Sequence, residues 1–202
     1  MESYMKLLKS LLLAASLLYA SVSSASLMIW LDPDFQLGST GDDVTLTLMA
    51  GGLGDGVAPS LAAFDLDVIF DPTVLTFTGY TLFDNLGDVF LFEADDFSLG
   101  DLGGVVALTE VSYLLDFELD ALQGSEFALA ELSFHIDDLA VPDSTHLSLF
   151  GYGFSDAFAG AFTDVTLRGA TIGTVPRDVP EPSTLFLMAL GLFAVTRNRV
   201  IK

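Results

Sequence analysis

The residues of this chain that could carry chemistry are two histidines and many closely spaced carboxylates. His135 and His146 each occupy a polar position in an alternating segment, and no Gly-x-Ser-x-Gly motif accompanies them. We therefore predict that both are surface histidines. A glycosidase needs two carboxylates about 5–10 Å apart, but an acidic chain contains such pairs by chance. The sequence thus singles out no catalytic residue among the following pairs: Asp42/Asp43, Asp65/Asp67, Asp95/Asp96 and Asp137/Asp138.

Three acidic segments could supply oxygen ligands to calcium, the ion whose ligand preference fits them best. These segments are Asp32/Asp34, Asp42/Asp43 and Glu93/Asp95/Asp96. None of them has the Asp-x-Asp-x-Asp-Gly pattern of a calcium loop. Because a solvated acidic surface is the simpler explanation, we predict no metal ligand and no cofactor, with calcium as the alternative.

Composition excludes several classes of function. The chain has 28 acidic and 7 basic residues, and Arg168 is the one basic residue between positions 26 and 176. Such a negative domain repels phosphate backbones, so we predict no nucleic-acid partner. Cysteine is absent, which excludes disulfides, thiolate catalysis and iron–sulfur clusters. With 51% apolar residues, the chain has enough material for a packed core.

The first 25 residues have the pattern of a secretory signal peptide. Lys6 and Lys9 precede an apolar run at 11–18, and Ser23 and Ala25 are small residues at the −3 and −1 positions of a cleavage site. The apolar run is shorter than the ~20 residues of a membrane span. We therefore predict cleavage after Ala25 rather than an uncleaved anchor.

The C-terminal end combines a proline motif, a short apolar segment and a basic tail. Pro180, Glu181 and Pro182 precede the apolar segment 185–195, which as a helix would be about 17 Å long, well short of a ~30 Å hydrocarbon core. The chain then ends in a basic tail, which is expected on the cytoplasmic side. The basic residues of this tail are Arg197, Arg199 and Lys202.

This arrangement resembles the PEP-CTERM sorting signals. The resemblance implies that exosortase, a membrane-embedded transpeptidase, recognises the Pro180-Glu181-Pro182 motif after export. It also implies transient inner-membrane anchoring through the C-terminal helix, followed by delivery to the cell envelope, cell surface or extracellular matrix of a biofilm-forming bacterium. A plain C-terminal membrane anchor remains the alternative.

The middle of the chain alternates with period two rather than with a helical period. Turn residues separate the alternating runs, and no long helical crossovers appear. We predict an all-β, antiparallel jelly-roll β-sandwich of about nine strands, flanked by an N-terminal signal helix and a short C-terminal apolar helix. The predicted domains are 1–25, 26–173, a linker at 174–183 and a sorting helix with basic tail at 184–202. The predicted strands are 27–31, 44–48, 64–70, 74–82, 88–93, 104–114, 128–136, 146–149 and 165–168.

Three segments of this middle region resemble the cohesin domain. They are Gly41–Thr47, Ala63–Leu75, with an Asp-Pro pair ending a strand, and Phe127–Phe134. The resemblance covers about residues 30–172 and implies a nine-stranded jelly roll, related to carbohydrate-binding modules, that binds dockerins without catalysis. The sequence assigns no dockerin-contacting face.

The hypothesis that follows is an exported, non-catalytic protein that binds an envelope or matrix protein or an exopolysaccharide. The alternative is a secreted glycan-active hydrolase. Among the 17 phenylalanines, Phe154, Phe158 and Phe162 form either part of the core or a strip that stacks on sugar rings.

Overall fold

The computed structural model describes residues 26–140 and 143–174. The predicted signal peptide with its cleavage site at Ala25, the Pro180-Glu181-Pro182 motif and the basic tail lie outside the described residues. No helix of the described part is both long enough and apolar enough to cross a membrane.

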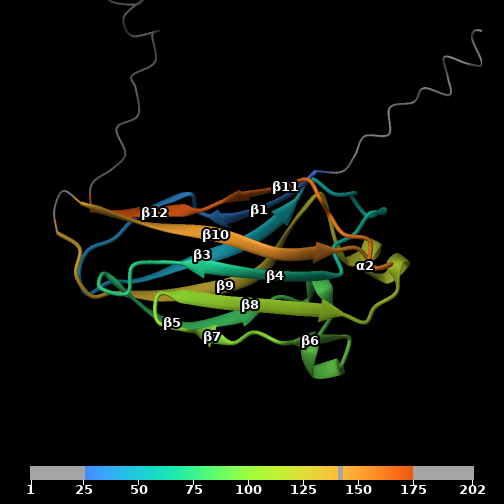
Figure 1. Ribbon diagram of the computed structural model, residues 1–202, viewed down its shortest axis with the longest axis horizontal. Coiled ribbons are helices and arrows are strands. Elements are labelled where there is room, and N and C mark those ends of the chain that lie inside the picture. Colours follow the sequence, from blue (N-terminus) through green and yellow to red (C-terminus); the bar gives the residue numbers. More distant parts are fainter. Residues whose placement is uncertain (1–25, 141–142, 175–202) are drawn as a thin grey trace, which may run out of the picture.

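The described residues form two packed β-sheets (Figure 1). The first sheet has the strand order β11-β1-β3-β9-β5, and the second has the order β2-β12-β10-β4-β8-β6, with β7 also paired to β8. The strands of the first sheet are β1 (Leu27–Asp32), β3 (Asp43–Gly51), β5 (Leu75–Leu82), β9 (Glu126–Ile136) and β11 (Val165–Arg168). Those of the second are β2 (Phe35–Leu37), β4 (Ala63–Ile69), β6 (Ala94–Asp96), β7 (Gly100–Asp101), β8 (Val105–Ser112), β10 (Ser144–Ser155) and β12 (Ala170–Gly173). The predicted sandwich is confirmed.

The described residues form twelve strands rather than the predicted nine or so, and two of the strand pairs are parallel. Both ends of the domain switch sheets: β1 and β11 lie in the first sheet, whereas β2 and β12 lie in the second. Because these terminal segments run in the same direction, β1 pairs with β11 and β2 with β12 in parallel, within an otherwise antiparallel sandwich. Gly169 sits at the switch between β11 and β12, where a Cβ atom would lie 1.9 Å from the Leu147 carbonyl oxygen. Only glycine fits there.

The core lies between the two sheets and follows the predicted alternation of β4. Phe64, Leu66, Val68 and Phe70 are all buried. In β9 the alternation is interrupted, because a β-bulge opposite Leu48/Met49 shifts the register. As a result Phe127 and Leu129 are buried and Ala128 is only half-buried.

The buried apolar residues of the described chain all lie between Leu27 and Ile172. Phe134 extends the packing through edge-to-face contacts with Phe70 and Phe77, at ring-centroid distances of 5.3 and 5.4 Å. Residues 26–174 therefore contain a complete core and can be expected to fold without the two terminal signals.

The predicted strand at 88–93 is wrong. Residues Val89–Leu91 form a 3₁₀ helix, η2, which follows a second one, η1 (Asp84–Leu86). The Asp88 carboxylate accepts hydrogen bonds from the backbone N–H groups of Phe90 and Leu91. The backbone of Phe92 adopts the left-handed conformation, with φ 61°. These contacts turn the chain, so strand pairing starts only at Ala94. The sequence analysis also missed the two-turn helix α2 (Asp116–Leu122).

Candidate binding surface

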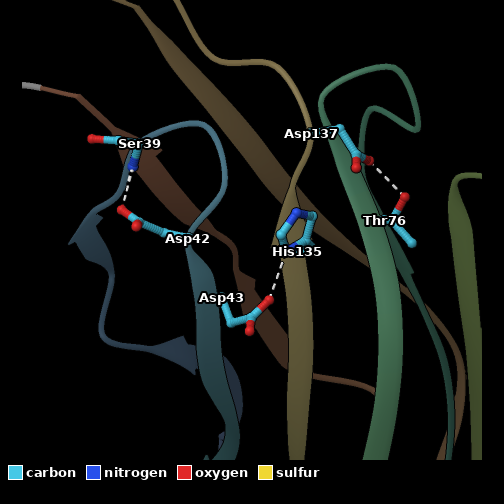
Figure 2. A network of polar contacts seen from close by, with 6 residues as sticks. All are labelled: Ser39, Asp42, Asp43, Thr76, His135 and Asp137. Atoms are coloured by element: carbon cyan, nitrogen blue, oxygen red, sulfur yellow. Dashed lines mark hydrogen bonds and ion pairs between the residues drawn. The ribbon is translucent and has the colours of Figure 1, made fainter.

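The two histidines lie at the surface, as predicted. His135 on β9 faces Asp43 on β3, with 2.7 Å between its Nδ1 and Asp43 Oδ1 (Figure 2). The hydrogen bond to Asp43 is the main reason why the pKa of His135 is raised above its ordinary value, and the nearby Asp137 and Asp42 charges add to it. Within the described residues, no serine or threonine hydroxyl completes this pair into a triad. His146 Nδ1 lies 3.0 Å from Thr171 Oγ1.

The paired carboxylates in this region cap neighbouring backbone and side chains instead of converging. Figure 2 shows Asp42 turned toward Ser39 and Asp43 turned toward His135. Asp42 accepts a hydrogen bond from the Ser39 N–H at 2.9 Å, and Asp137 accepts one from the Thr76 hydroxyl at 2.6 Å. Over residues 26–140 and 143–174, no three His, Asp or Glu side chains come together as a metal-binding group.

Asp32 and Asp34, another predicted calcium candidate, line a surface hollow of about 500 Å³ beside Trp30. Arg168 lines the same hollow. A cation entering there would meet the guanidinium group, so the surroundings do not favour a calcium site.

Tyrosine hydroxyl groups take the place that lysine or arginine would usually take beside surface carboxylates. Tyr113 donates to Asp95 at 2.6 Å and Tyr152 donates to Asp67 at 2.8 Å. These hydrogen bonds raise the pKa of both tyrosines. Because the donors are neutral, the negative charge of the domain stays uncompensated.

The outer face of the β10–β4–β8 sheet carries a groove of about 430 Å³, which we call the sheet groove. Strands β4 and β8 form its floor, where the Thr109 hydroxyl donates to Asp65 at 2.9 Å. Its walls are largely apolar and solvent-exposed. The lining residues are Asp65, Asp67, Phe97, Leu99, Leu102, Ala107, Thr109 and Tyr152.

One wall of the sheet groove is the segment that contains Phe97 and Leu99. The backbone N–H groups of these two residues donate to the carbonyl groups of Thr109 and Ala107 at 2.8 and 3.1 Å. The segment is thereby held along β8 while its side chains point to solvent, with Phe97 54% and Leu99 73% exposed. Exposed apolar side chains gathered on one face are typical of interaction sites.

The other wall depends on a β-bulge in β10. The register of β10 against β4 shifts between Gly151 and Gly153. Phe150 and Tyr152 continue the exposed face of the strand and pack edge-to-face at 5.0 Å, whereas the shift turns Phe154 into the core. Phe162 packs against the core and Phe158 is exposed, so the three phenylalanines of the predicted sugar-stacking strip do not form one.

None of the groove residues except Asp65 and Asp67 was singled out from the sequence. A signal was present, because Phe97, Leu99 and Leu102 are apolar residues among glycine and aspartate in a segment too short for a core strand. The missing information was the side of the sheet on which the segment lies.

Comparison with known proteins identifies two features of the chain. Residues 178–200 match the PEP-CTERM protein-sorting motif. The fold is similar to that of cohesin CaCohA2 from Clostridium acetobutylicum, with a TM-score of 0.59 and 16% identity, covering 77% of this chain and 94% of the cohesin. No curated protein matches the chain over its sequence.

Other cohesins give the same result. The cohesin of a type I cohesin–dockerin complex from Clostridium thermocellum has a TM-score of 0.56 and 8% identity, covering 73% of this chain and 98% of the cohesin. A cohesin module of a Clostridium perfringens family 33 glycoside hydrolase has a TM-score of 0.53 and 12% identity, covering 73% and 94%. The chain thus combines an export-and-sorting signal with a cohesin-like β-sandwich.

Proposed function

We propose that this protein is a non-catalytic binding module, displayed at the cell surface or in the extracellular matrix, that holds a protein partner in the sheet groove. The observation that carries the proposal is the apolar, exposed groove on the outer face of the β10–β4–β8 sheet. The groove contains Tyr152 and Phe97, and aromatic residues of both types are enriched at protein interfaces. One outer sheet face can supply the roughly 800 Å² per partner of a standard interface.

The partner is a protein of the envelope or matrix, with a dockerin-type module as the first candidate. The cohesin-like fold supports this choice, because a cohesin of the same fold is seen in complex with a dockerin. Exopolysaccharide is the second ligand class. The PEP-CTERM motif supports sorting by exosortase through Pro180, Glu181 and Pro182, with cleavage of residues 1–25 at Ala25 and transient membrane anchoring through residues 184–202.

The hydrolase alternative finds less support in the described residues. The carboxyl group whose pKa is raised to about 8 belongs to Glu110, which has 0% exposure and does not contact the sheet groove. A polymeric glycan therefore cannot reach it in this conformation.

The test compares residues 26–174 with variants on and off the groove. Immobilised wild-type domain, Tyr152→Ala and Leu99→Ala are exposed to envelope and matrix fractions of the host bacterium, a dockerin panel and its exopolysaccharide. Affinity is then measured on the purified ligand by calorimetry. We expect a protein ligand, with each variant weakening binding about tenfold, or about 1.4 kcal/mol.

Phe158→Ala is the matched control, since Phe158 is 78% exposed and lies outside the groove. Equal losses in Phe158→Ala and Tyr152→Ala would contradict the assignment of the groove. If the domain hydrolyses a polysaccharide and a single Asp or Glu substitution abolishes this activity, the protein is the hydrolase and the binding-module proposal is wrong.

A further inference from the structure

Glu110 is the least expected side chain of this fold. It lies on β8 in alternation with Val106 and Leu108, so it points into the space between the sheets. It has 0% exposure, and neither of its carboxyl oxygens has a hydrogen-bond partner. Buried polar side chains in native proteins are nearly always hydrogen-bonded, so an unpaired buried carboxyl group needs an explanation.

Glu110 lies near one edge of the sandwich, beside a second carboxylate. Asp96 on β6 stands directly opposite Glu110 in the β6–β8 pairing, so both side chains leave the same face of the sheet. Asp96 in turn accepts a hydrogen bond from the Tyr80 hydroxyl at 2.7 Å. Since β5 and β6 are edge strands of opposite sheets, this hydrogen bond joins the two sheets at that edge.

A pocket of about 320 Å³ opens at this edge, which we call the edge pocket. Its walls combine aromatic rings with carboxylates, and its lining includes Tyr80, Phe83, Asp84, Phe90 and Asp96. The edge pocket shares no lining residue with the sheet groove. Figure 1 shows β6 on the opposite side of the sandwich from β12, the last strand of the domain.

The charge of the edge pocket has no internal counter-ion. Asp84 and Asp96 both lie close enough to Glu110 to act on its ionisation. Arg168, the one Lys or Arg side chain of the described residues, lines the hollow beside Trp30 instead. The negative field of the pocket and the π-faces of its rings both favour a positive group from outside.

The nature of the positive group follows from the geometry. A metal ion needs several oxygen ligands converging on one point, and the described residues contain no such group of three. A guanidinium or ammonium group is larger, can stack on a ring and can donate to carboxylates that lie apart. The pocket volume is at the small end of ligand sites, which suits one long side chain or one small molecule.

We propose that the edge pocket binds an organic cation on a flexible stem, chiefly the guanidinium group of an arginine from a protein partner. Asp84 and Asp96 accept from its N–H groups, and Phe83 and Phe90 offer ring faces to it. Glu110 is not part of the pocket lining, and it acts on the bound cation only through its charge, next to Asp96. The proposal stands independently of the sheet groove.

Binding should be linked to proton release. Burial, followed by the Asp96 and Asp84 charges, raises the pKa of Glu110 to about 8, so the group is protonated at neutral pH without a ligand. The groups that face it are Asp96 from β6, Asp84 from η1 and, across β4, the uncharged Phe64. A bound cation favours the carboxylate. Affinity is therefore expected to rise with pH between 6 and 8, by up to about tenfold per pH unit.

The experiment is an NMR titration of residues 26–174 with the amide of Gly-Arg-Gly. The matched ligand control is Gly-citrulline-Gly amide, which has the same shape without the charge. We expect saturable shifts around Tyr80 and Phe90 with the arginine peptide and none with citrulline. Asp84→Asn and Asp96→Asn should each weaken binding about fivefold or more, and Glu110→Gln should abolish the pH dependence.

Asp164→Asn is the matched control variant, because Asp164 is exposed and lies outside the pocket while its substitution removes the same charge. Equal weakening by Asp164→Asn would show general electrostatic attraction and overturn the site. So would equal shifts with citrulline, or calcium chloride displacing the peptide through the same residues. If spermidine bound more tightly than the arginine peptide, the proposal of an arginine from a protein partner would be wrong, and the ligand would be a free polyamine.

Discussion

Replacing the buried Glu110 with glutamine should change how the stability of the domain depends on pH. The pKa of this carboxyl group is about 8 in the folded protein, against an ordinary value of 4.5. The folded state therefore holds one more proton than the unfolded state between these two pH values. The stability that comes from this extra proton on Glu110 is fully present below pH 4.5 and is lost as the pH rises through about 8.

The size of the effect follows from the difference between the two pKa values. The interval from 4.5 to about 8 corresponds to about 5 kcal/mol of folding free energy. This value is the upper limit of the pH-dependent change in the free energy of unfolding of the wild type. It is large compared with the roughly 5–15 kcal/mol that stabilises a typical domain. Glutamine has nearly the same shape as the protonated acid and does not titrate. Glu110→Gln should match the wild type at pH 4.5–5 and exceed it by several kcal/mol at pH 9.

Urea unfolding at pH 5, 7 and 9 measures this difference, with the fluorescence of the single tryptophan, Trp30, as the probe. The other carboxylates titrate equally in both proteins, so the difference between the two curves isolates Glu110. Parallel curves across this pH range would show that Glu110 is not protonated in the folded state, and the argument from burial would then fail.

Three further predictions concern sorting, charge and packing. Replacing Pro180-Glu181-Pro182 with three alanines should leave full-length protein in the inner membrane, as followed by fractionation and immunoblotting; normal maturation would contradict the sorting hypothesis. Raising NaCl from a few millimolar to 0.15 M should raise the melting temperature of residues 26–174, because 25 carboxylates face one arginine and salt screens repulsion beyond about 8 Å; a flat curve would mean that the charges are too dispersed to matter. Phe64→Ala should cost roughly 3–5 kcal/mol in urea unfolding, because Phe64 is 1% exposed in the core, whereas the exposed Phe158→Ala should cost little; equal costs would contradict the assigned core.

Much of the architecture was predictable because each feature leaves a local pattern. Alternation in β4 predicts both the strand and its buried face, since side chains of a strand point to opposite sides. The C-terminal sorting motif is a short linear pattern that can be recognised without a fold. The strand predicted at 88–93 failed for a local reason too, because the Asp88 carboxylate competes for the backbone N–H groups that a strand would use.

The sequence by itself determined the sorting motif, the β-sandwich and the unbalanced charge, because these follow from a short linear motif, from periods of two residues and from composition. Tertiary structure alone decided where the alternation breaks, and with it the site. The β10 bulge separates Tyr152 from Phe154, and the pairing of β6 with β8 sets Asp96 opposite Glu110. Both depend on register between strands far apart in the chain, and a one-residue difference moves a side chain to the other face. No local pattern contains that information, so a buried glutamate could be found only in the folded protein.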